Sequence, residues 1–438
     1  MAATPFHLGW FLQGSSVQAW GEPWTGHIGR NWMVPELFTD MARCLERACF
    51  DYILIEDSSY VGESFGGSTE IYLKNAIAVP RQDPSVVASL MTAVTSRIGI
   101  VPTFGTYAYP PYLLARLVAS LDQVSSGRIG WNAVTGSSDF AAMNFGLPGM
   151  PEHDLRYDMA DEYMQAVNAL WDSWEPGAII ADRHSGVLVD PTKVHAANHE
   201  GRFFKTRGPL NSGPAPQGRP VIAQAGGSPR GRQFAAQHAD TIVAHTKGIA
   251  AMKSYRDDVR RRMTACGRDP DRCKVLFLVA PIIGETEDEA QQRKRARAAR
   301  AEATLAQRLA HFGKVTNIDF GKFDLDQPLP ADVTTNGHQQ NLEEFRAKAA
   351  GRTIRQAMTD HNATALSVEL VGTPDSVAAR MGEVMEEAGG DGFLFSLPNV
   401  NRRTLAEIED GLVPALQDRG LTRNSYTHAQ FRDNLLEF

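Results

Sequence analysis

The chain has 438 residues, of which 43% are apolar and 22% charged, a composition typical of an ordinary globular protein. Its length corresponds to roughly two to three average domains, although a single α/β barrel with insertions can also exceed about 400 residues. The net charge of −7 argues against a protein that binds nucleic acid or an anionic membrane surface, because either would need a basic face.

The sequence contains no features of export or of membrane insertion. The N-terminal residues lack the basic and apolar regions of a signal peptide, and no run approaches about 18 consecutive apolar residues. The four cysteines contain no CxxC pair, which in a chain of this length is typical of reduced thiols. We therefore expect a soluble, cytoplasmic protein without a membrane partner.

Short apolar runs alternate with amphipathic helical patterns, which indicates a parallel sheet with crossover helices. Eight runs are predicted to be strands, each followed by a helical pattern. They cover residues 6–11, 52–55, 98–102, 128–133, 220–224, 241–243, 274–279 and 392–395. Eight strands close a barrel, whereas an open doubly wound sheet usually has five or six. The fold class predicted for residues 1–438 is a single (β/α)8 TIM barrel.

Three segments lie outside this repeat. Residues 174–218, rich in proline and glycine, follow the fourth strand unit, and the polar residues 312–365 follow the seventh. Loops of this length in a compact domain are usually functional or lid-like. The tail, residues 421–438, has no evident place in the barrel and is a candidate for contact with a neighbouring subunit.

The run from Val221 to Arg232 predicts an anion-binding turn. A buried strand ends at Gln224, Gly226 and Gly227 turn the chain, and Ser228 followed by proline is typical of a helix N-cap. A helix N-terminus behind a glycine turn presents free N–H groups to a phosphate. The alternative is a tight turn that binds nothing, because no dinucleotide or P-loop motif is present.

Other polar residues follow the predicted strands at the same face, where barrel active sites gather. Asp57, Thr106 and Asn132 come after strands two, three and four. Arg156 and Tyr157 open the helix after strand four and are able to reach a phosphate. Each residue also has a simpler explanation as a helix cap, a turn residue or a surface side chain.

The sequence indicates chemistry that depends on an organic cofactor. His195 and His199 have HxxxH spacing but lie in a loop-like stretch without a glutamate between them, so we expect loop hydrogen bonds and no metal site. No GxSxG elbow or acidic metal cluster is present either. Chemistry without a metal or a strong nucleophile is usually supplied by a cofactor.

The residues around the expected active-site face favour an apolar substrate. The rim loops 12–24 and 58–69 contain no arginine or lysine, which a polyanionic substrate would need. Phe11, Trp20 and Phe65 lie in or beside these loops and are predicted to line a pocket for a hydrophobic, aromatic molecule. Aromatic side chains are more often core residues, and that alternative applies to each of them.

In collinear order, several segments resemble the bacterial-luciferase-like flavin monooxygenases. The most specific are PYLLAR…GRIGWNAVTG and RGPLNSGPAPQGRPVIAQAG, which are similar to the nitrilotriacetate, EDTA and dibenzothiophene-sulfone monooxygenase branch. The resemblance implies a barrel enzyme of xenobiotic degradation that uses FMNH2 and O2. A separate NAD(P)H:FMN oxidoreductase would supply the FMNH2. It also implies a small-molecule substrate and a homo-oligomer, either a dimer or a tetramer.

The resemblance assigns the cofactor contacts. Asp57, Thr106 and Asn132 would line the isoalloxazine ring. Arg156, Tyr157, Gly227 and Ser228 would hold the phosphate, in agreement with the helix N-terminus argument. Relatives often carry serine where this chain has Gly136, so Ser137 is expected to take over one phosphate contact.

Two candidate catalytic residues follow from the same comparison. Many relatives have Trp-Arg-His-Pro after the first strand, whereas this chain has Trp20-Gly21-Glu22-Pro23, which makes Glu22 a candidate acid–base residue. His311, in an Ala-His-Phe-Gly segment, resembles a histidine that some relatives place over the flavin. It is a candidate proton donor or peroxide stabiliser, with a solvent-facing helix end as the alternative.

Two other functions are compatible with the same barrel. One is an F420-dependent dehydrogenase, which would transfer hydride without oxygen. The other is a flavin-binding subunit without catalytic activity. The RGPLN…PQGRP segment favours the FMN-dependent branch.

Overall fold

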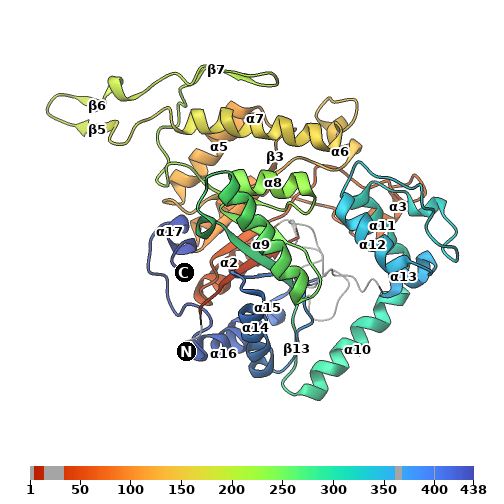
Figure 1. Cartoon of the computed structure of the whole chain (residues 1–438). Coiled ribbons are helices and arrows are strands. Elements are labelled where there is room, and N and C mark those ends of the chain that lie inside the picture. Colours follow the sequence, from red (N-terminus) through yellow and green to blue (C-terminus); the bar gives the residue numbers. More distant parts are fainter. Residues whose placement is uncertain (1–3, 14–33, 361–366, 399) are drawn as a thin grey trace.

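The computed structural model describes residues 4–13, 34–360, 367–398 and 400–438. Eight parallel strands form a closed barrel in which the order around the barrel follows the order along the chain. They are β1 (His7–Leu12), β2 (Tyr52–Ile55), β3 (Gly99–Gly105), β4 (Gly130–Val134), β9 (Val221–Gln224), β10 (Thr241–Ala244), β11 (Lys274–Val279) and β14 (Gly392–Phe395). The predicted (β/α)8 barrel is confirmed, and all eight strands fall where the apolar runs predict them (Figure 1).

Helices surround the barrel and connect its strands. The principal ones are α2 (Glu36–Arg47), α4 (Pro84–Ala93), α5 (Pro111–Val124), α7 (His153–Trp171), α8 (Pro229–His238), α9 (Ile249–Ala265) and α14 (Pro374–Ala388). The shorter elements are α3 (Glu70–Lys74), α6 (Asp139–Asn144), η2 (Pro270–Arg272), β12 (Ile282–Ile283), β13 (Val371–Gly372), α15 (Arg402–Ala406), the π-helical turn η4 (Glu407–Leu412) and α16 (Val413–Asp418). Helix α5 shows the common pattern, because Leu114, Val118 and Leu121 recur on one face and are buried.

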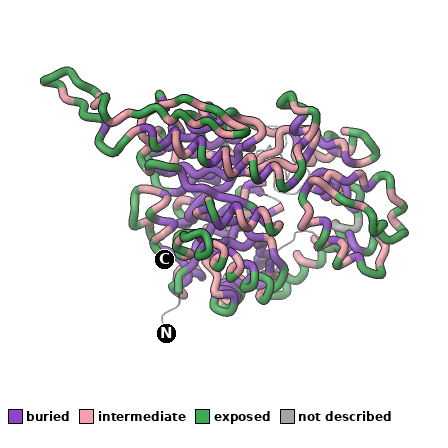
Figure 2. Tube along the Cα trace, turned by 45° about the horizontal axis from the view of Figure 1, so that its top comes forward, coloured by how far each residue is buried: buried purple, intermediate pink, exposed green. Residues whose placement is uncertain are grey.

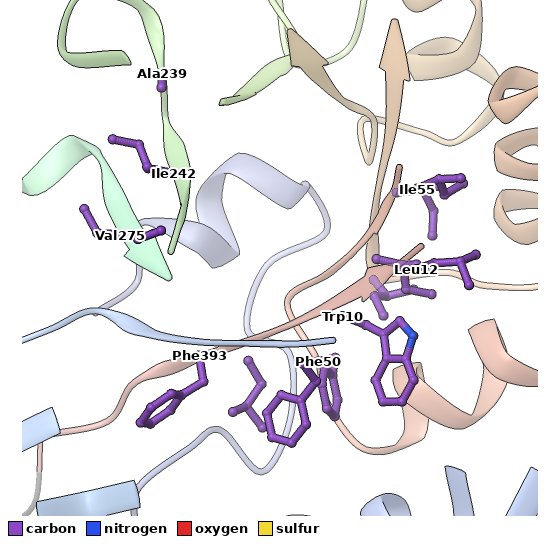
Figure 3. Close-up of a cluster of buried hydrophobic side chains, with 14 of the residues drawn as sticks. Trp10, Leu12, Phe50, Ile55, Ala239, Ile242, Val275 and Phe393 are labelled. Atoms are coloured by element: carbon purple, nitrogen blue, oxygen red, sulfur yellow. The ribbon is translucent and has the colours of Figure 1, made fainter. Parts of the chain in front are cut away.

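Successive side chains of each strand point alternately into two apolar layers, as the two-residue period of a barrel strand requires. Outward-facing side chains pack under the helices in the larger core cluster, which Figure 3 shows in part around Trp10, Phe50 and Phe393. Inward-facing side chains such as Leu54 and Val101 fill the barrel interior. Because the interior is packed, a ligand is expected only above this layer.

The tail folds back on the N-terminal end of the barrel. Phe431 of α17 (Phe431–Leu435) inserts into the interior cluster, where a Cβ atom at Gly99 would lie 2.6 Å from its ring. Arg423 donates to Asp51 at 2.7 Å, and His7 lies 3.0 Å from the same carboxylate. The tail therefore has a structural place within its own chain, which the sequence did not suggest.

The first insertion lies between α7 and β9. It contains an antiparallel hairpin of β5 (Ile179–Asp182) and β6 (Val187–Val189), the turn η1 (Pro191–Lys193), and the short pair β7 (His199–Glu200) and β8 (Lys205–Thr206). The β5–β6 hairpin extends away from the barrel (Figure 1) and its side chains are largely exposed (Figure 2).

The second insertion lies between β11 and β14 and has its own apolar core. It comprises α10 (Glu287–Ala303), α11 (Leu305–Thr316), η3 (Phe320–Lys322), α12 (Gln339–Ala349) and α13 (Ile354–Asp360). Helices α10 and α11 are separated at Thr304: α10 carries no large apolar side chain, whereas α11 buries Leu309 and Phe312 in that core. No described helix is long and apolar enough to cross a membrane.

Substitution of Asp51 by alanine is expected to destabilise the protein strongly. Burial alone would raise the pKa of Asp51, but His7 and Arg423 outweigh it and hold the pKa below its usual value. Removing the carboxylate would leave the Arg423 charge buried without this partner, at a cost of about 3–5 kcal/mol of unfolding free energy. Chemical denaturation measures this cost.

Asp40→Ala is the matched control, because Asp40 is exposed and pairs with Arg402 on the surface. The control should cost less than about 1 kcal/mol. Equal small effects of the two substitutions would show that the tail does not depend on Asp51.

Candidate functional site

Polar side chains gather at the carboxyl ends of β2, β3 and β4. Thr106 donates its backbone N–H to the Val134 carbonyl at 3.0 Å, and the Asn132 amide nitrogen donates to Thr103 Oγ1 at 2.9 Å. The Asn132 Oδ1 atom is buried and has no hydrogen-bond partner in the described part of the chain. A buried acceptor of this kind is costly unless a ligand satisfies it.

The turn after β9 has the predicted helix-capping geometry. Ser228 is the N-cap of α8, and its hydroxyl accepts from the Gly231 N–H at 3.0 Å. A Cβ atom at Gly226 would lie 2.5 Å from the Gly231 carbonyl oxygen, so the close approach of the chain requires glycine. The local prediction of a strand, a glycine turn and a capped helix is confirmed.

Tyr157 of α7 packs beside this turn. Its hydroxyl interacts with the side chains of Gln224, Thr135 and Ser228, and burial raises its pKa, so the phenol keeps its proton. The Gln224 Oε1 atom is buried and has no hydrogen-bond partner among the described residues. From the sequence, Gln224 was predicted only as the last residue of a strand. That its polar side chain lines the site was not predicted.

Arg156 holds the second insertion in place. Its terminal nitrogens donate to the side chain and the backbone carbonyl of Asn336 at 3.0 and 2.9 Å and to the Pro151 carbonyl at 2.6 Å, while Nε has no described partner. Gln340 of α12 donates to the His245 carbonyl at 3.0 Å and lies against Gly227. The insertion therefore lies directly over the predicted phosphate corner.

The local structure around residue 136 favours glycine. Gly136 has a φ of 82°, and a Cβ atom there would lie 2.6 Å from Met150 and 2.8 Å from Tyr107. A serine at this position would be strained and crowded. Ser137 lies beside it, half-buried.

An acidic pair and an arginine lie at the end of β2. Arg81 is 2.8 Å from Glu56 and 3.8 Å from Asp57. Burial raises the pKa of Asp57 to about 6, against the opposing charge of Arg81 and with the support of Glu56. Asp57 is therefore the carboxyl group at this edge that titrates close to neutral pH.

His311 of α11 lies close enough to this acidic pair for the charge of Glu56 to act on its imidazole. Its side chain keeps exposed surface, yet the surrounding protein and the charge of Lys314 lower its pKa to about 4, with Glu56 opposing. Burial and the charges of Arg156 and Lys314 lower the pKa of His338, which precedes α12, to about 4. At neutral pH His311 is an uncharged imidazole that can exchange hydrogen bonds but is not an imidazolium acid.

The remaining predicted residues divide into two groups. Glu22 and Trp20 lie outside the described residues. Phe11 lies half-buried on β1 against the interior cluster of the barrel, next to the site. Phe65 packs against the core of the second insertion, so its ring supports the insertion and does not stand free in a pocket.

A hollow of about 670 Å³ lies elsewhere on the molecule. Its lining includes Trp171, Asp240 and Arg432, and it adjoins the residues that precede β9, β10 and β11. That position is at the amino ends of the strands, opposite Asn132 and the β9 turn, and Arg432 already pairs with Asp240 at 3.0 Å. Barrel active sites form at the carboxyl ends, so we do not assign the chemistry to this hollow.

Residues 9–392 match the family model described as luciferase-like monooxygenase. The chain belongs to this family. It is 35% identical to a dibenzothiophene-sulfone monooxygenase of Rhodococcus erythropolis strain XP, with 98% of this chain and 96% of the relative covered. It is 34% identical to nitrilotriacetate monooxygenase component A of Aminobacter aminovorans, with 91% and 89% covered. The predicted branch is confirmed.

A solved structure supports the same relationship. A riboflavin lyase crystallised with modified FMN and riboflavin superposes with a TM-score of 0.89 and 31% identity. The superposition covers 99% of this chain and 96% of the lyase chain. The chain is thus a member of an oxidoreductase family whose relatives named here are monooxygenases or hold a flavin.

Replacing Asp57 by asparagine is expected to stabilise the protein at neutral pH. Because the folded-state pKa of about 6 lies above the usual value of 3.8, ionisation of Asp57 weakens folding as pH rises between these values, and the full penalty persists above pH 6. Asparagine should recover about 1–3 kcal/mol at pH 7 and nothing below about pH 4. Thermal unfolding across this range measures the difference.

Asp332→Asn, at an exposed position in the second insertion, is the control and should show no such pH dependence. A loss of stability in Asp57→Asn at pH 7 would contradict the account of Asp57.

Proposed function

We propose that the protein is the oxygenase component of a two-component, FMNH2-dependent monooxygenase. The family relationship supports the reaction class, and the carboxyl end of the barrel supplies two polar regions on the paired strands β4 and β9. One surrounds the β9–α8 turn and the other lies around Asn132. The single observation that carries the proposal is the pair of unsatisfied buried amide oxygens, Asn132 Oδ1 and Gln224 Oε1, one in each region.

The phosphate end of FMN fits the β9–α8 turn. The N-terminus of α8 favours an anion, and the protonated Tyr157 hydroxyl is a hydrogen-bond donor beside Ser228. Gly227 has no side chain at this corner and is half-buried, with Gln340 lying against it. Arg156, the residue before Tyr157, contributes positive charge, although its terminal nitrogens already donate hydrogen bonds to Asn336. Ser137 is the further hydroxyl that we assign to this corner.

The ring end of FMN fits the ends of β2, β3 and β4. Asn132 Oδ1 is available to accept from a ring N–H group, with Asp57 and Thr106 beside it. Reduced FMN, when bound, supplies the electrons that activate O2. Asp57, with a pKa near 6, is suited to exchange protons there, and neutral His311 is suited to hold a hydrogen bond. Glu22 is the second acid–base residue that we propose.

The substrate that we propose is a small hydrophobic molecule, such as an aromatic sulfone or a halogenated ring. Phe11 borders the interior cluster beside the site, and rim loops 12–24 and 58–69 contain no basic residue. The relative that acts on dibenzothiophene sulfone agrees with this class, whereas the nitrilotriacetate enzyme shows that the family also accepts polyanions.

The proposed partners are an NAD(P)H:FMN oxidoreductase and further copies of the chain. The name of the nitrilotriacetate relative as a component A supports a multi-component system. The alternatives are an F420-dependent dehydrogenase and a flavin-binding subunit without activity. The family match favours the oxygenase over both.

A reconstituted assay tests the proposal. The protein, a flavin reductase, NADH and FMN are combined with aromatic sulfones, halogenated aromatics and aminopolycarboxylates, and O2 uptake and products are followed. We expect oxidised product from the aromatic compounds. Turnover of aminopolycarboxylates alone would refute the substrate class, and hydride transfer with F420 but not FMN would refute the cofactor.

In the same assay, Phe11→Ala should raise KM for an apolar substrate. The lost contact corresponds to about 1–3 kcal/mol of apolar burial. Phe65→Ala is the comparison, because it should lower the stability of the second insertion with a smaller effect on KM. Unchanged kinetics in Phe11→Ala would identify that ring as a core residue only.

Tyr157→Phe should weaken FMN binding about 3- to 10-fold, the loss expected for one hydrogen bond. Riboflavin, which lacks the phosphate, should bind both proteins equally. Tyr163→Phe is the matched control, because Tyr163 is buried on the same helix and donates to the Tyr109 carbonyl away from the turn. An equal loss for FMN and riboflavin in Tyr157→Phe would contradict the phosphate assignment.

A further inference from the structure

Lys314 is a buried ammonium group that lacks a carboxylate partner. It lies on α11 and is 4% exposed. Its Nζ atom donates to Ser58 Oγ at 2.8 Å and lies 4.6 Å from the centre of the Tyr60 ring. Among the described residues no carboxylate oxygen lies within 4 Å of it, although an ammonium carries three donor hydrogens.

The charged groups around Lys314 do not explain its burial. Glu56 and Asp57 follow the end of β2, where Arg81 pairs with Glu56 at 2.8 Å and lies 3.8 Å from Asp57. His311, one turn earlier on α11, is uncharged at neutral pH. Glu56 is therefore already paired with Arg81, and the contacts of Lys314 Nζ among the described residues are a hydroxyl and an aromatic ring.

A structural role alone does not account for a lysine here. Burial of an unpaired charge is unfavourable, and an apolar side chain of similar length would fill the same space without that cost. Burial and the charge of Arg81 lower the pKa of Lys314 to about 8, while Glu56 and Asp57 oppose them. At neutral pH the group is still mainly protonated, and it occupies the ring end of the site because Ser58 directly follows Asp57.

Resting on the proposed function, we propose that Lys314 binds an anionic or strongly polarised oxygen atom of the ligand at the mouth of the barrel. Two sources have this chemistry. One is the ring of reduced flavin, whose negative charge is spread over its carbonyl oxygens. The other is a polar group of the substrate, such as a sulfonyl oxygen. In either case Lys314 positions the ligand through a charge-assisted hydrogen bond.

The test compares Lys314→Met with Lys314→Arg, which retains the charge. Lys322→Met is the matched control, because Lys322 belongs to the same insertion and its side chain is 76% exposed. Thermal unfolding without ligand is measured first. Lys314→Met should unfold at the same temperature as the wild type or higher, because it removes an unfavourable buried charge.

Binding of three probes then identifies the oxygen. FMNH2 under anaerobic conditions, oxidised FMN and diphenyl sulfone are titrated separately into each protein. If the reduced ring is the source, Lys314→Met should weaken FMNH2 binding about 10- to 100-fold and oxidised FMN much less. If the substrate is the source, only the sulfone should lose affinity. Lys314→Arg should restore part of the lost binding.

The pH dependence separates charge from packing. In the wild type the affected probe should bind more weakly as pH rises through about 8, because Lys314 loses its proton, and this dependence should vanish in Lys314→Met. Unchanged binding of all three probes in Lys314→Met would overturn the proposal, as would an equal loss for all three together with a lower unfolding temperature.

Failure of the proposed function gives a different result. A wild-type protein that binds neither form of FMN would contradict the FMN-dependent reaction. Binding of the sulfone that falls with pH in the wild type and not in Lys314→Met would then still support Lys314 as an oxygen-binding residue. Without that pH-dependent binding, the proposal for Lys314 would fail as well.

Discussion

The candidate site depends on the position of the second insertion over the barrel, and the hydrogen bonds between Arg156 and Asn336 are a buried part of that attachment. Arg156 opens the helix that follows β4, whereas Asn336 precedes α12 in the insertion. With the insertion in this position, Gln340 lies on Gly227, and the side of α11 that carries His311 and Lys314 faces Glu56 and Asp57. One buried guanidinium thus connects the phosphate corner with the residues of the ring end.

The two ends of the barrel differ in how their charges are satisfied. At the amino end Asp51 is paired with both His7 and Arg423, and the tail covers this network. At the carboxyl end Asp57, His311 and Lys314 all have pKa values displaced toward their neutral forms, and two buried amide oxygens have no hydrogen-bond partner in the part of the chain that the structure describes. Groups held in unfavourable environments are typical of functional sites, where a ligand completes the arrangement.

The sequence predicted those features that depend on neighbouring residues. Apolar runs located the eight strands, and the succession from Gln224 to Pro229 located the glycine turn and the capped helix. Contacts between distant segments have no such local signal. Arg156 and Asn336 are 180 positions apart, and the fit of Phe431 against Gly99 requires the closed barrel to exist first. The sequence alone could have placed Lys314 near the site, because it lies three residues after His311 and therefore on the same side of a helix.

The most direct measurement of the central claim is the origin of the oxygen atom in the product. The protein is supplied with FMNH2 that has been reduced photochemically, so that no reductase is present, and the reaction with an aromatic sulfone is run under ¹⁸O2. The account predicts product that carries one labelled oxygen atom for each FMNH2 consumed productively. Product without label, or flavin oxidation without any product across the substrate classes proposed, would contradict the assignment of this chain as the oxygenase.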